Sequence, residues 1–119
     1  MEDRVTLRLP VPPSVNSLYA NVPGVGRITS RRYKQWQKEA GWQILIQKPP
    51  RVYGPYRLTI TLPRALRGDV TNRIKAAEDI LVKHRVTDDD RFAEGVTIKR
   101  GDVTEMEIEI EAASARKTA

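Results

Sequence analysis

Three segments of the chain alternate apolar and polar residues, which is the pattern of a β-strand with one buried face. They cover residues 4–9, 56–62 and 103–111. In the last of them Met and Ile alternate with glutamates, so its acidic face is expected to meet water. A further strand is expected just before it, over residues 92–99.

A first helix is predicted over residues 30–47. Ser30 is a suitable N-cap, and Lys48-Pro49-Pro50 ends the helix because proline cannot continue it. Its apolar residues recur three or four positions apart and form one stripe, which we expect to face the core. These residues are Tyr33, Trp36, Ala40 and Ile44.

A second helix is expected from near Asp69 to about Lys83. With about 100° of rotation per residue, it has one apolar face and an opposite polar face. The faces consist of Val70, Ile74, Ala77 and Leu81 on one side, and of Asn72, Lys75, Asp79 and Lys83 on the other.

The order of elements is strand, helix, strand, helix, strand, strand. It predicts a single α+β domain over residues 1–113, with two helices packed on a small mixed sheet. Residues 14–29, rich in Asn, Pro and Gly, are expected to form a long loop, and residues 84–91 a connection. Residues 114–119 are expected to be a flexible tail.

Composition excludes several classes of function. The 119 residues include no Cys and one His, so disulfide scaffolds, cysteine-ligated metals and multi-histidine sites are excluded. No apolar run approaches the roughly 20 residues of a membrane span, and the start, Met1-Glu2-Asp3, does not resemble a signal peptide. We therefore expect a cytoplasmic protein with no membrane partner and no small-molecule cofactor. The net charge of +6 favours a polyanionic partner.

Two groups of residues could carry acidic-site chemistry. Asp88, Asp89 and Asp90 are consecutive, and their mutual repulsion would be offset by a hard cation such as Mg²⁺ or Mn²⁺. A solvated acidic turn is the alternative. Asp69 lies at the edge of the helix face that carries Lys75, where a carboxylate could hold a metal while the lysine meets a phosphate. Here the alternative is that Asp69 caps the helix.

Basic residues in the loops suit a protein that grips a nucleic-acid backbone, although a solvated surface remains the alternative. Trp36 and Trp42 are expected in the core rather than as base-stacking platforms. His84 follows a helix C-terminus, which favours its charged form. The basic residues are Arg27, Arg31, Arg32, Lys34, Arg64 and Arg67.

Four short motifs follow one another along the chain. They are LPVPPSVN at residues 9–16, the segment 27–36 with its Arg, Thr, Tyr and Trp, DVTNRIK at 69–75 continuing to Asp79 and Leu81, and VTDD at 86–89. In this order, over residues 5–111, they resemble the RusA family of Holliday junction resolvases, found in bacteria, phages and prophages.

The resemblance implies a RusA-like fold and a homodimeric endodeoxyribonuclease of DNA recombination and repair. Such an enzyme needs a divalent metal, normally Mg²⁺ with Mn²⁺ as a possible substitute, and nicks four-way junctions symmetrically. Carried over residue by residue, it implies Asp69, Lys75 and Asp89 as catalytic residues and Asp69, Asp89 and Asp88 as metal ligands, with Asp90 in a register shifted by one. The implied DNA contacts are Asn16, Arg27, Arg31, Arg32, Arg64, Arg67 and Asn72.

One position departs from the family pattern. Thr71 stands where the second aspartate of the helix motif is usual, so the site has one negative charge fewer and weaker metal binding is expected. The spacing from Asp69 to the acidic loop is also one residue shorter. A catalytically weak or inactive protein that binds branched DNA is therefore an alternative, as is a small basic domain that binds RNA or protein.

Overall fold

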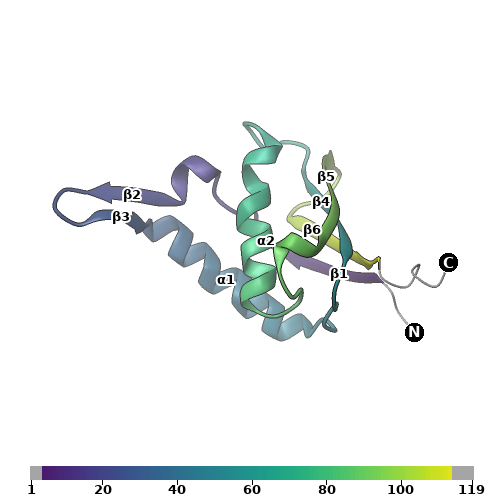
Figure 1. Ribbon diagram of the computed structural model, residues 1–119. Helices are drawn as coiled ribbons and strands as arrows, with labels where there is room; N and C mark the ends of the chain where they lie inside the picture. Colours follow the sequence, from purple (N-terminus) through teal and green to yellow (C-terminus); the bar gives the residue numbers. More distant parts are fainter. Residues whose placement is uncertain (1–3, 114–119) are drawn as a thin grey trace.

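The computed structural model describes residues 4–113, which form a sheet, a separate hairpin and two α-helices (Figure 1). The expected tail at 114–119 lies outside the described residues. The strands are β1 (Arg4–Leu9), β2 (Tyr19–Val22), β3 (Gly26–Thr29), β4 (Tyr56–Pro63), β5 (Ala93–Gly101) and β6 (Met106–Ala112). The helices are α1 (Arg31–Gln47) and α2 (Ile74–Lys83), with short 3₁₀ helices η1 (Val15–Ser17), η2 (Val70–Arg73) and η3 (Asp90–Phe92).

The main sheet has the strand order β1-β6-β4-β5. β6 is antiparallel to both of its neighbours, whereas β4 and β5 run parallel, so the expected mixed sheet is confirmed. Both helices lie on the same side of this sheet, and their apolar faces join its inner face in one core (Figure 1). The α+β class is therefore confirmed. Within residues 4–113, no helix is long and apolar enough to cross a bilayer.

The outer face of the sheet is covered with paired charges. The alternation predicted for the last strand is confirmed, with Met106, Ile108 and Ile110 fully buried. Its glutamates meet arginines of the flanking strands; Arg4 Nε, for example, lies 2.8 Å from Glu109 Oε2. Since these charges neutralise each other, the acidic strand leaves little unpaired negative charge on this face.

The expected loop at 14–29 was wrong in part, because it contains the hairpin of β2 and β3. Its strands carry mostly exposed side chains, so their sequence has no alternation to reveal them. Gly24 and Gly26 take positive φ and permit the tight turn. At the other end, Ser30 N donates to Leu18 O at 2.9 Å, and Leu18 is buried. The hairpin thus projects from the core on an anchored base (Figure 1).

The first helix follows its prediction closely. Ser30 Oγ accepts a hydrogen bond from Tyr33 N at 3.1 Å, and the whole predicted stripe is buried. Trp36 lies in the core and donates from Nε1 to Pro10 O at 2.8 Å. Trp42 does not, because its side of the helix has no covering element and the residue is 64% exposed. Its expected place in the core was wrong.

The second helix begins later than predicted. Its first turn is the 3₁₀ helix η2, and regular α-helix starts only at Ile74. Asp69 is extended, and within the described chain its side chain makes no capping hydrogen bond, so the capping alternative is wrong. The last two strands begin one and three residues later than predicted and end at Gly101 and Ala112.

Candidate active site

The loop after β4 carries Asp69 to the start of η2. Arg100, near the end of β5, donates hydrogen bonds to the carbonyls of Leu66 and Gly68, the latter at 2.7 Å. Gly68 has φ of +86°, a conformation that favours glycine. Asp69 is therefore exposed at the end of a braced loop, and its carboxylate makes no hydrogen bond or ion pair within residues 4–113. Arg100 is a supporting residue that no local sequence pattern identifies.

Lys75 is the second residue of α2 and is exposed. Its Nζ is 3.4 Å from Asp79 Oδ2. It also lines a groove of about 340 Å³ together with Tyr19, Arg27 and Thr29 of the hairpin. The Arg27 guanidinium lies 4.2 Å from the centre of the Tyr19 ring, which holds it over the groove. Two predicted site residues from distant segments, Arg27 and Lys75, therefore share one surface.

Glu78 is an acidic residue of this region that the sequence analysis did not select. Burial raises the pKa of its carboxyl, and the charges of Asp90 and then Asp79 raise that pKa further, whereas Lys75 lowers it. These carboxylates of α2 and η3 thus repel each other, and a bound cation would relieve the repulsion. In the sequence, Glu78 could have been recognised by its position three residues after Lys75, at the border of the polar helix face.

Asp89 stands immediately before η3 and caps it. Its Oδ1 accepts a hydrogen bond from Arg91 N at 3.0 Å, and this bond is the main cause of a lowered pKa of the carboxyl. Burial raises the pKa of the Tyr56 hydroxyl to about 12, and the charges of Glu78, Asp90 and Asp89 act in the same direction. Asp89 is therefore ionised at neutral pH, whereas the Tyr56 hydroxyl is protonated.

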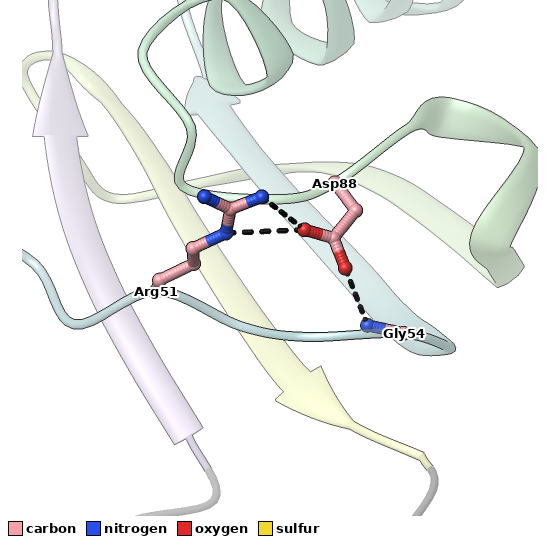
Figure 2. Close-up of polar contacts among 3 residues, drawn as sticks. All are labelled: Arg51, Gly54 and Asp88. Carbon is pink, nitrogen blue, oxygen red and sulfur yellow. Dashed lines mark hydrogen bonds and ion pairs between the residues drawn. The ribbon is translucent and has the colours of Figure 1, made fainter.

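Asp88 is held by protein groups, as Figure 2 shows. Arg51 donates from Nε to Asp88 Oδ1 at 3.1 Å and from Nη2 to the same oxygen, while Gly54 N donates to Oδ2 at 2.9 Å. The Gly54 hydrogen bond, followed by that of Arg51, lowers the pKa of the Asp88 carboxyl. Both oxygens thus join the turn after α2 to the segment before β4, a connection that spacing in the sequence does not reveal.

The carboxylates of Asp69 and Asp89 are each of the ligand type that hard cations prefer. Within residues 4–113, no three or more Asp, Glu, His or Cys side chains come close enough together to hold a metal by themselves. Mg²⁺ commonly takes only one or two carboxylates and completes its shell with waters and substrate phosphates. Exposed carboxylates without His or Cys therefore fit Mg²⁺ or Mn²⁺ when a phosphate is present.

The predicted DNA contacts lie on several elements around this region. Arg31 and Arg32 begin α1 and are exposed, and Arg67 is exposed in the loop before Asp69. Arg64 forms an exposed ion pair with Asp102 at 3.1 Å. Asn16 is exposed on η1, and Asn72 is half-buried on η2.

Arg73 was not selected from the sequence. It donates from Nη1 to Pro12 O at 2.7 Å, and burial lowers the pKa of its guanidinium. It therefore ties η2 to the proline-rich segment that precedes η1.

The expectation that the charged form of His84 is favoured was wrong. His84 follows the C-terminus of α2, but burial and then the charge of Lys83 lower the pKa of its imidazole. Desolvation outweighs the helix dipole here, so the neutral form is favoured at neutral pH.

Exposed carboxylates near basic side chains are compatible with an enzyme that acts on phosphodiesters. The family model for endodeoxyribonuclease RusA matches residues 10–111. The chain therefore belongs to the RusA family, whose members are nucleases that act on Holliday junctions. No match was found among curated proteins.

Proposed function

We propose that this chain resolves four-way DNA junctions by paired, symmetric nicks in recombination and repair, with a divalent metal ion and as a homodimer. The observation that carries the proposal is the position of Lys75 beside repelling carboxylates of α2 and η3, in a chain of the RusA family. Metal, dimer and paired nicks are each open to separate tests.

Asp69 and Asp89 are the proposed metal ligands. The carboxylate of Asp69 is exposed, and the lowered pKa of Asp89 keeps it ionised at neutral pH. The exposed ion pair of Asp89 with Arg91, at 3.9 Å, is one that a divalent cation would replace. Bound Mg²⁺ would lower the pKa of a water and polarise the phosphate. Asp88 belongs to the proposed site as a positioning residue, because its oxygens already accept hydrogen bonds from Arg51 and Gly54.

Lys75 is proposed to neutralise the negative charge that develops on the phosphate. Its ammonium group is exposed and bound only by Asp79, at 3.4 Å, among the described residues. Fixed cations that act on developing charge typically contribute about 10²- to 10³-fold to the rate. Arg27 on the same groove is proposed to hold a neighbouring phosphate.

The homodimer follows from the symmetry of the substrate. Two nicks on opposed strands of a junction need two active sites related by a two-fold axis, and the chain supplies one candidate site. A purified chain that sediments only as a monomer, with and without junction DNA, would contradict this part of the proposal.

The decisive experiment compares an end-labelled four-way junction with linear duplex of the same sequence. We expect paired nicks in the junction alone, in Mg²⁺ or Mn²⁺ but not in EDTA. Asp69→Asn and Asp89→Asn should abolish cleavage while junction binding persists. The control is Asp102→Asn, which removes a more exposed aspartate that is not a proposed metal ligand.

A second candidate function is a protein that binds branched DNA and cuts it weakly or not at all. Thr71 favours it, because its neutral hydroxyl is exposed on η2 where the family motif has an aspartate. Tight junction binding with no nicks in either metal would select this function. Junction-independent binding to RNA or protein would contradict both.

A further inference from the structure

A second groove runs along one side of α1 and reaches the C-terminal end of α2. It has a volume of about 420 Å³ and is lined by Lys34, Lys38, Trp42 and Leu45 of α1 together with Lys83 and His84 at the end of α2. Trp42 is 64% exposed and Leu45 is 60% exposed. Because Trp42 and Leu45 line the same groove, their exposed apolar surface is shared, and contiguous exposed apolar surface marks interaction sites. We call it the Trp42 groove.

The charge of the Trp42 groove indicates its occupant. Lys34, Lys38 and Lys83 all line it, no carboxylate does, and none of the three forms an ion pair within residues 4–113. A second copy of the chain docked here about a two-fold axis would bring these lysines against each other, which costs free energy. A polyanion instead gains from all three.

The floor of the groove is fixed by a close contact between α1 and the end of α2. A Cβ atom at Gly41 would lie 2.6 Å from His84 Nε2, so glycine at this position makes room for the imidazole ring. His84 therefore lies against the backbone of α1, next to Trp42. With His84 packed against α1, the indole ring of Trp42 is an exposed aromatic surface in a groove that also contains three lysines.

We propose that the Trp42 groove binds single-stranded DNA, with one base stacked on Trp42 and backbone phosphates on Lys38 and Lys83. Exposed aromatic rings within basic grooves bind unpaired strands in this way, because every base offers a π-face. Lys83 lies eight residues after Lys75 on the same polar face of α2, with Asp79 between them. The polar face of α2 therefore links the candidate active site to the Trp42 groove, which receives the strand that leaves that site. Only the choice of DNA over RNA as the ligand rests on the proposed function.

The test is titration of the intact chain with a labelled oligothymidylate, followed by fluorescence anisotropy. We expect Trp42→Ala to weaken binding by about 5- to 150-fold, the range for loss of one stacked base. Lys38→Gln and Lys83→Gln should weaken it less and reduce its salt dependence. In the wild type, stacking of a base should quench the fluorescence of the exposed Trp42, while the fluorescence of the buried Trp36 should not change.

Two control variants match the exposure and charge changes. Tyr53→Ala removes an aromatic residue that is 68% exposed elsewhere, and Lys99→Gln removes an exposed lysine of β5; both should bind like the wild type. Thermal unfolding of each variant confirms that the fold is intact. Unchanged affinity in Trp42→Ala would overturn the proposal. So would a Trp42→Ala variant that loses self-association but keeps its DNA affinity, because the groove would then be an interface between copies.

The proposal and the proposed function can fail separately. Asp89→Asn should lose junction cleavage and keep Trp42-dependent binding of the oligonucleotide. If metal-dependent cleavage is present while Trp42→Ala binds normally, the groove proposal fails alone. If the oligonucleotide binds through Trp42 but no junction is cut in any metal, the groove proposal stands and the nuclease proposal fails.

Discussion

Arg51 and Asp88 are 37 residues apart in sequence, and the guanidinium donates two hydrogen bonds to one carboxylate oxygen. The other oxygen accepts a hydrogen bond from Gly54 N, so the aspartate joins the turn after α2 to the segment before β4. The same turn continues into Asp89, one residue later. The ion pair therefore positions the candidate catalytic carboxylate through the backbone that the two aspartates share.

Asp88→Asn is expected to lower the free energy of unfolding in a pH-dependent way. The pKa of Asp88 is lowered in the folded chain, so its contribution is complete above its unfolded pKa and is lost as pH falls below about 4. Urea unfolding at pH 7 should show a lower midpoint for the variant, and the difference should shrink near pH 3. Asp102→Asn, which alters a more exposed ion pair, should shift the midpoint less at either pH. A difference that stays constant with pH would contradict the assigned cause.

Lys75→Ala is expected to lower junction cleavage by about 10²- to 10³-fold, with little loss of junction binding. The reason is that one cation among many contributes little to the affinity but acts directly on charge developing at the phosphate. Single-turnover cleavage and electrophoretic binding assays separate the two effects. Lys99→Ala provides the control for loss of one positive charge. Equal losses of binding and cleavage would show that Lys75 only grips the backbone.

Thr71→Asp is expected to add the missing negative charge to the proposed metal site. It should reduce the Mg²⁺ concentration needed for half-maximal cleavage, because affinity for hard cations rises with ligand charge. The matched control is Thr71→Asn, which adds a side chain of similar shape without the charge and should leave the Mg²⁺ requirement nearly unchanged. If both variants behave alike, Thr71 does not lie where a metal ligand is needed.

The sequence predicted those elements whose burial leaves a periodic pattern. The stripe of α1 and the alternation of β4 and β6 are of this kind, and all were confirmed. The hairpin of β2 and β3 was missed because its side chains are exposed, so tertiary anchoring through Leu18 rather than patterning defines it. Trp42 was misplaced because hydrophobicity alone does not say which helix face lacks a neighbour.

In the candidate site, too, residues within local motifs could be predicted, whereas residues brought in by long-range contacts could not. Asp69, Lys75 and Asp89 were selected from local motifs, and the structure places Lys75 beside Arg27 of the hairpin. The loop before Asp69 is supported by a residue that is distant in sequence, because Arg100 and its partner Gly68 are 32 positions apart. Contacts at such separations leave no pattern in a single sequence.

Gly41→Ala is expected to destabilise the fold by about 1–3 kcal/mol, the usual cost of overpacking. The new Cβ would lie 2.6 Å from His84 Nε2, so the imidazole ring must move out of its seat on α1. Urea unfolding measures the loss, and Gly95→Ala is the control because a Cβ there meets nothing within 4 Å. In a double-mutant cycle, His84→Ala should remove most of the penalty. An undiminished penalty in the His84→Ala background would mean that the helix backbone, and not the His84 contact, requires glycine at this position.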